Sequence, residues 1–203
     1  MDGLCITNYC DRRCSPFTSI TRVSEEEARR LAKQLAANIS PAFTSFSRFG
    51  EDTFDGYYQK RLRTEVWLYE HFVALGGKPH SRHPLYFVLQ ESTYLEQWYE
   101  NGIKTRLPLG SIDAADISFT YGDSMSRMDS ADRMNPFTKE SLSRFLQKKS
   151  DDVVSFLQEL NKQNRYIEVQ LWNDRYVQDL VCCHPRMGKD AAHACDGRHQ
   201  CKA

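Results

Sequence analysis

The strongest constraint on the fold lies in residues 165–174, RYIEVQLWND, where apolar and polar side chains alternate. One set of alternate positions is purely apolar, and it consists of Ile167, Val169 and Leu171. A period of two residues with β-branched and aromatic side chains predicts a β-strand that is buried on at least one face. The other set places Glu168 beside Gln170 between two aromatic residues. This polar set fits either an edge strand facing water or a catalytic strand on which Glu168 stabilises positive charge on a ligand.

Composition indicates a globular chain of the size of one domain. The 203 residues are 40% hydrophobic and 27% charged, which excludes disordered and fibrous classes. The formal net charge is zero, so no global basic field attracts nucleic acid, although a local basic groove remains compatible with it. The longest apolar run, near residues 85–89, is too short to cross a bilayer. The N-terminus has no apolar signal stretch, so we expect a cytoplasmic protein without membrane contact.

The seven cysteines lie only before residue 15 and after residue 181. An odd count in a chain expected to be cytoplasmic predicts reduced thiols, and the central domain must fold without disulfides. The Cys and His residues after position 181 match no zinc-site spacing, and the central part has no H-E-x-x-H motif, so we assign no metal ligands. We therefore predict an irregular N-terminal arm over 1–16, a single domain over 17–180 and a Cys/His-rich tail over 181–203.

Periodicity and capping signals give a mixed order of helices and strands. Ser24 begins a capping box, S-E-E-E, before an apolar stripe at helical spacing. Gly76 and Gly77 end a long helix, and Pro79 prevents its continuation. Helices are predicted over 24–39, 54–75, 92–102, 138–148 and 151–164. Strands are predicted over 17–22, 83–89, 103–109, 115–121 and 165–174. This order, mixed and not strictly alternating, predicts an α+β fold.

Polar residues gather where the predicted strands end, which is where ligand sites are commonly built. The candidates are Thr21, Arg22, Tyr86, Tyr121, Asp123, Ser124, Glu168 and Gln170. Ordinary structural roles remain open for them: Arg22 would pair with a helix glutamate, and Asp123 would cap a turn. No G-x-S-x-G elbow and no phosphate-binding G-x-x-x-x-G-K-[ST] loop is present. Basic and aromatic residues such as Arg61 and Trp98 fit either a nucleic-acid-binding face or a solvated surface.

The order of these motifs resembles the ADP-ribosyltransferase superfamily, most nearly its compact, toxin-type branch that modifies nucleic acid. The resemblance covers about residues 20–175 and depends on Thr21-Arg22, PLYFVL, ISFTYGDSM and the late strand with Glu168. It implies a split mixed β-sheet flanked by helices, with NAD in a cleft and no metal. Glu168 would be the catalytic carboxylate, with Gln170 beside it. Thr21, Arg22, Tyr86, Tyr121, Asp123 and Ser124 would contact NAD.

Two positions differ from the family's pattern. The arginine-modifying branch has Gln or Glu two residues before the catalytic Glu, whereas here Gln170 lies two residues after it. The DNA-modifying branch has an arginine soon after the strand that resembles LYFVL, whereas here QES follows and Arg82 precedes the strand.

The resemblance thus implies an NAD-dependent ADP-ribosyltransferase that modifies a macromolecule, with RNA or DNA as the expected acceptor. It would act as a toxin or defence protein restrained by an inhibitory partner. Arg22, Tyr121 and Glu168 should then converge on one cleft. Two other hypotheses remain open: a non-enzymatic module that binds protein or nucleic acid, and a metal-independent nuclease that uses Glu168, Asp174 and His83.

Overall fold

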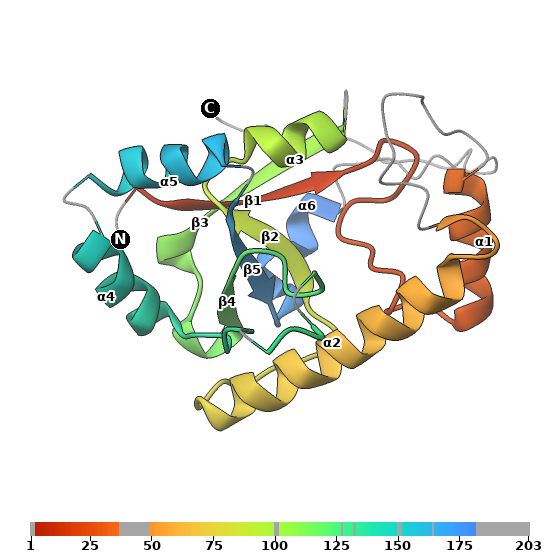
Figure 1. Ribbon diagram of the computed structural model, residues 1–203, viewed down its shortest axis with the longest axis horizontal. Coiled ribbons are helices and arrows are strands. Elements are labelled where there is room, and N and C mark those ends of the chain that lie inside the picture. The colour runs from red at the N-terminus through yellow and green to blue at the C-terminus, as the bar shows by residue number, and fades with distance from the viewer. Residues whose placement is uncertain are drawn as a thin grey trace.

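The computed structural model describes residues 3–36, 49–99, 102–126, 128–131, 133–149, 152–163 and 165–181. A five-stranded sheet with the order β3-β1-β2-β5-β4 forms its centre (Figure 1). The strands are β1 (Cys5–Cys10), β2 (Leu85–Leu89), β3 (Ile103–Pro108), β4 (Ile117–Tyr121) and β5 (Ile167–Leu171). The predicted α+β class is confirmed. The sheet is not mixed, however, because every neighbouring pair of these strands is antiparallel.

Six helices accompany the sheet within the described residues. They are α1 (Glu25–Ala36), α2 (Phe54–Ala74), α3 (Thr93–Trp98), α4 (Lys139–Lys149), α5 (Val153–Lys162) and α6 (Gln178–Val181). The first five occupy the segments where capping and periodicity predicted helices. The Ser24 hydroxyl accepts from the Glu27 amide at 3.2 Å, as expected of a capping box. Helix α6 was not predicted, and residues of the predicted tail from 182 onward lie outside the described part of the chain.

The N-terminal prediction was wrong in two respects. Residues 5–10 belong to strand β1 and not to an irregular arm, whereas residues 17–22 form turns and not a strand. Strand β1 pairs with β3 at six positions and with β2 at two, so partners distant in sequence fix its extended conformation. Its sequence, CITNYC, places consecutive polar residues in the middle, which hides the two-residue period.

The two faces of the sheet differ in chemistry. Phe87 and Phe119 lie opposite Val169 on neighbouring strands, and all three side chains belong to the apolar face. Leucines of α4 and α5 cover this face and complete the main hydrophobic core. These two helices lie together on one side of the sheet in Figure 1.

The opposite face is polar and buried. Glu168 lies between Val88 and Thr120, and Gln170 lies between Tyr86 and Ser118. Helix α2, the long helix along the lower edge of Figure 1, covers part of this face. Its Phe72 ring stacks on Trp172 with centroids 5.5 Å apart. The polar side chains of the sheet are therefore enclosed by protein, which is the property that a catalytic strand requires.

The sheet is split between β1 and β2. These strands share only the Ile6–Leu89 and Thr7–Val88 positions among the described residues. Past these positions the Asn8 side chain bridges the strands by donating to the Tyr86 carbonyl oxygen at 2.8 Å. The divergence leaves a space beside the polar face. No helix within the described ranges is long and apolar enough to cross a membrane.

Candidate functional site

A pocket of about 240 Å³ lies where β1 and β2 diverge. Its walls come from β1, β2 and β5, from helices α2 and α3, and from the loops around Ser19 and Asp123. We call it the main pocket. Glu168 lies in its wall, facing Arg61 of α2, and aromatic rings form much of the remaining surface. The pocket thus joins a carboxyl group, a cation and aromatic rings, a combination that is typical of ligand sites.

Neighbouring side chains hold the Glu168 carboxyl group, which is only 6% exposed. Gln170 donates from Nε2 to Glu168 Oε1 at 2.9 Å, and Thr120 donates to the same oxygen at 3.4 Å. The amide oxygen of Gln170 accepts from Ser118 Oγ at 2.9 Å, which fixes the orientation of the amide. Gln170 is fully buried and does not line the main pocket, so it positions Glu168 from behind.

Burial raises the pKa of Glu168 to about 7, and the negative charge of Asp123 adds to this effect. The Ser124 hydroxyl, the Arg61 guanidinium and the Gln170 amide oppose the increase. The carboxyl group therefore changes its charge near neutral pH. A group with this pKa can accept a proton during a reaction, and it ionises more readily when a cationic ligand binds beside it.

Arg61 supplies a positive charge within the main pocket. Its Nε donates to Glu65 Oε1 at 3.0 Å, and its Cζ lies 3.6 Å from the centroid of the Tyr86 ring. One terminal nitrogen contacts the Met125 sulfur at 3.3 Å, and a thioether is a weak acceptor. The guanidinium side chain, only 15% exposed, thus retains strong donors for an anion.

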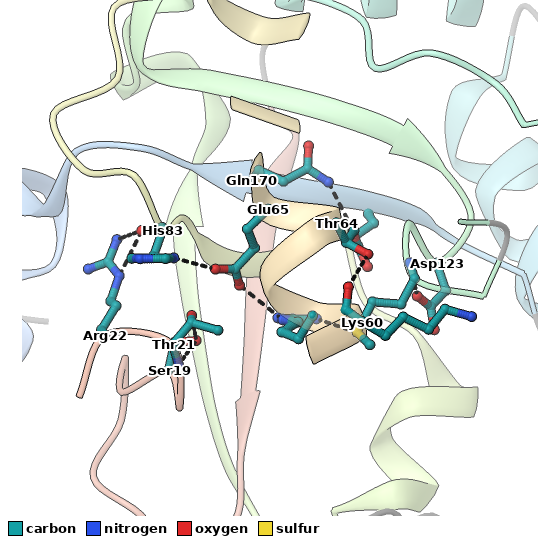
Figure 2. A network of polar contacts seen from close by, with 12 residues as sticks. Ser19, Thr21, Arg22, Lys60, Thr64, Glu65, His83, Asp123 and Gln170 are labelled. Carbon is teal, nitrogen blue, oxygen red and sulfur yellow. Dashed lines mark hydrogen bonds and ion pairs between the residues drawn. The ribbon is translucent and has the colours of Figure 1, made fainter. Parts of the chain in front are cut away.

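Arg61 is held by a polar network, and Figure 2 shows how Glu65, His83 and Arg22 follow one another in it. The Glu65 carboxylate is fully buried, and its second oxygen, Oε2, lies 2.6 Å from His83 Nδ1. The His83 carbonyl oxygen accepts from Arg22 Nε at 2.8 Å, and Arg22 pairs with Asp174 at 2.7 Å. Removal of one partner from such a buried ion pair is costly, so Glu65 holds the Arg61 guanidinium in place.

Two buried polar atoms at the main pocket lack partners. Thr7 Oγ1 and Asn8 Oδ1 make no hydrogen bond within the described residues, whereas Tyr86 Oη lies close enough to the Glu65 carboxylate for that contact to affect its pKa. Burial raises the pKa of Tyr86 well above its ordinary value, so this hydroxyl stays protonated and can donate. Because buried polar groups are nearly always paired in native structures, the Thr7 and Asn8 oxygens indicate contacts that a polar ligand would complete.

Aromatic residues shape the opening between β1 and α3. Tyr9 stacks on Tyr99 with ring centroids 6.4 Å apart. Phe17 also lines the main pocket, and its ring stacks at 6.1 Å on Phe87, whose side chain belongs to the apolar face of the sheet. Phe17 has a φ of 60°, a left-handed conformation that is strained for an aromatic residue. Such strain is characteristic of binding sites, where surrounding contacts maintain it.

The structure brings only some of the predicted site residues together. Glu168, Tyr86 and Asp123 line the main pocket, with Gln170 behind them. Ser124 is buried beside Asp123, lies close enough to lower the pKa of Glu168, and completes no hydrogen bond of normal geometry.

The other predicted residues lie elsewhere. Arg22 pairs with Asp174, and Thr21 binds Ser19 at 2.8 Å, so neither lines the main pocket. Tyr121 belongs to the apolar face, where its ring contacts Phe145 edge-on. Arg22 and Tyr121 therefore do not meet Glu168 in one cleft. Asp174 and His83 of the alternative nuclease set do not line the main pocket either, because Asp174 pairs with Arg22 and His83 with Glu65.

Sequence reasoning did not assign Arg61, Glu65 or the polar residues of β1 to the site. A signal for the first two was present in α2. Positions 58, 61, 65, 68 and 72 have helical spacing, and all but Arg61 are buried residues of α2. An oppositely charged pair within a buried stripe indicates a function more specific than packing.

Comparisons with protein-family models, curated proteins and solved structures found no match to this chain. Within the described residues, no three His, Cys, Asp or Glu side chains are grouped so as to hold a metal ion. The groups that this site offers to a ligand are the Arg61 guanidinium, the unpaired polar atoms, the aromatic rings and the two carboxyl groups at positions 123 and 168.

Proposed function

We propose that the protein is an NAD-dependent ADP-ribosyltransferase that uses Glu168 as its catalytic carboxylate. The supporting observation is a carboxyl group that is buried, has a pKa of about 7 and lines a pocket with Arg61 and Tyr86. The late strand with this glutamate is also the feature on which the family resemblance depends. Following that resemblance, the acceptor is RNA or DNA, and the protein acts as a toxin or defence factor controlled by an inhibitory protein.

The charges of the main pocket suit a dinucleotide. NAD has a cationic nicotinamide ring and an anionic diphosphate. Glu168 and Asp123 would attract the ring, while the free donors of Arg61 would bind a phosphate oxygen. Tyr86 and the unpaired Asn8 oxygen would complete polar contacts. In this proposal Arg61 contacts NAD, whereas Arg22, which the resemblance placed in contact with NAD, does not line the main pocket.

The chemistry requires stabilisation of positive charge in a dry site. The C–N bond between ribose and nicotinamide breaks, and nicotinamide leaves with the electron pair. Positive charge then develops on the ribose, where the fixed Glu168 carboxylate stabilises it more strongly than water would. An N–H or O–H group of the acceptor attacks the anomeric carbon and loses its proton. With a pKa of about 7, Glu168 can also accept that proton.

Nicotinamide release provides the test. Purified protein with NAD should release nicotinamide slowly, because water replaces the acceptor. Glu168→Gln should lower this rate by about 100-fold or more while NAD binding persists, since the neutral amide keeps the shape but not the charge. Arg61→Met should chiefly raise the KM for NAD. Glu159→Gln changes an exposed glutamate on α5 and should leave both parameters unchanged.

Two results would contradict the proposal. If no nicotinamide is released with water, RNA or DNA as acceptor, the pocket belongs to a binding module. If the protein cleaves RNA in the absence of NAD and Glu168→Gln abolishes the cleavage, the nuclease hypothesis replaces the transferase.

A further inference from the structure

A second pocket, also of about 240 Å³, shares a wall with the main pocket. Tyr94, Trp98 and Tyr166 bring aromatic side chains to it, Tyr121 adds a further part of the wall, and Arg165 contributes a cation. We call it the Tyr94 pocket. Trp98, Asp123 and Tyr166 line both pockets, so a group bound in one lies beside a group bound in the other.

Local structure explains how these rings gather. Tyr94 and Trp98 are four residues apart on α3 and therefore lie on one side of the helix, with ring centroids 5.3 Å apart. The Ser92 hydroxyl caps this helix by accepting from the Leu95 amide at 3.3 Å. Tyr166 directly precedes β5 and supplies the third aromatic side chain. A hydrogen bond of 2.9 Å from the Gly122 amide to the Tyr166 carbonyl oxygen joins this position to the end of β4.

The lining favours a flat ring attached to a negative charge. Aromatic side chains bind nucleobases by stacking, and an exposed arginine binds phosphate. Arg165 is exposed and forms no ion pair with another described residue. A cationic side chain of a protein acceptor would instead meet repulsion from Arg165. The carboxylate of Asp123 is held by the Met125 amide at 2.8 Å and faces both pockets.

We propose that the Tyr94 pocket holds an unpaired nucleobase of a single-stranded nucleic acid, which is the acceptor of the reaction. This inference rests on the proposed function. A base must be unstacked to enter a pocket of aromatic rings, which selects single strands over duplexes. The group to be modified then points across the shared wall towards the ribose of NAD. Its N–H or O–H forms the new bond to the anomeric carbon, nicotinamide leaves, and Asp123 or Glu168 receives the proton.

The experiment measures binding and nicotinamide release on the same full-length variants. Fluorescence anisotropy with labelled single-stranded DNA and RNA oligonucleotides, and with a duplex of the same sequence, gives the affinities. Tyr94→Ala should weaken single-strand binding by about 10-fold, as expected for one lost stacking contact. Tyr94→Phe keeps the ring and should bind normally. Arg165→Ala should weaken binding and reduce its dependence on salt. Release of nicotinamide into water should be unchanged in all three variants.

The outcomes separate this inference from the proposed function. If single strands bind through Tyr94 but nicotinamide is never released, the pocket assignment stands and the transferase proposal fails. If Tyr94→Ala raises the KM for NAD and leaves oligonucleotide affinity intact, the pocket holds the adenine of NAD and the inference is overturned. It is likewise overturned if duplexes bind as tightly as single strands. Binding of a cationic peptide that is weakened by Tyr94→Ala, with no such effect on any oligonucleotide, would also overturn it.

Discussion

At the scale of single residues, Glu168 is a carboxyl group placed where a sheet usually buries apolar side chains. Thr120 and Gln170 hold one of its oxygens, yet burial raises its pKa to about 7. Ionisation of Glu168 therefore lowers the free energy of unfolding. The carboxyl group stays buried because the side chains that surround it belong to a rigid sheet. Local costs in stability are common at functional sites, which agrees with the role proposed for Glu168.

The raised pKa predicts how stability changes with pH. An unfolded Glu ionises near pH 4.5, whereas folded Glu168 ionises near pH 7. Between these values the folded state binds more protons, so the free energy of unfolding falls as pH rises through this window. Glu168→Gln removes the effect. The variant should be similar to the parent protein below pH 4.5 and more stable above pH 7, by about 3 kcal/mol at most.

Urea denaturation at pH 4.5 and pH 8 measures this difference. Other groups titrate equally in the two proteins, so their effects cancel in the comparison. If the difference in free energy of unfolding between parent and variant does not increase with pH, the carboxyl group is not desolvated.

At the scale of elements, helix α2 combines a core-forming stripe with a buried ion pair. Arg61 and Glu65 lie between Tyr58 and Leu68 on the side that covers the polar face of the sheet. The pair therefore connects the folding of the helix to the electrostatics of the main pocket.

A double-mutant cycle should reveal this coupling. Glu65→Leu leaves Arg61 without its carboxylate, and Arg61→Met leaves Glu65 partly unpaired, so each single change should cost about 3 kcal/mol or more. The double variant should lose less free energy of unfolding than the two single variants lose in sum, by about 1–3 kcal/mol. The exposed Glu159–Lys162 pair on α5 is the control, with an expected coupling below about 0.5 kcal/mol. Equal coupling in the two cycles, measured by denaturation, would contradict a buried role for Glu65.

Gly122 determines how the chain leaves β4 and presents Asp123. Its φ is 81°, and a Cβ there would meet no other atom, so Gly122→Ala tests backbone conformation alone. We expect a loss of about 1 kcal/mol together with weaker nicotinamide release. Gly110 has an ordinary φ and equal space, so Gly110→Ala should be neutral or slightly stabilising. Thermal unfolding of both variants makes the comparison, and equal losses would show that the turn at Gly122 needs no glycine.

Helices with local signals were predictable from sequence, whereas strands defined by distant partners were not. Ser24 and Gly76 mark helix ends by interactions within a few residues. The strand with Glu168 was predicted because the residues of β5 alternate strictly. Strand β1 was missed because its pairing with β3 fixes its conformation, and its polar residues complete a pocket that no local pattern describes. Arg61 was left open between a nucleic-acid-binding face and a solvated surface, because its burial depends on how α2 crosses the sheet.

At the scale of the whole molecule, one face of the sheet forms the hydrophobic core and the other face lines the pocket proposed as the site. Its apolar face packs against α4 and α5 in one large core. Its polar face holds the main pocket, and helix α1 packs in a separate, smaller cluster. The site can therefore contain strained and unpaired groups while the opposite face supplies most of the hydrophobic burial.

This division predicts a gradient of backbone protection. Strands β2 and β5 each have neighbours on both sides and lie over the main core. Their amides should exchange with deuterium slowest, and the edge strand β3 and helix α1 should exchange at least about 10-fold faster. Hydrogen exchange followed by mass spectrometry measures this order. Protection of α1 equal to that of β5 would indicate a single cooperative core and contradict the division.

The pH dependence of nicotinamide release tests the central claim most directly, because it reports the charge of Glu168 during the reaction. The rate at saturating NAD should rise about tenfold per pH unit at low pH and level off at an apparent pKa of about 7 or lower, since the bound cationic ring favours the carboxylate. Glu168→Gln should give a rate at least about 100-fold lower that no longer changes with pH in this range. A rate that is independent of pH from 5 to 8 and survives Glu168→Gln would contradict the account.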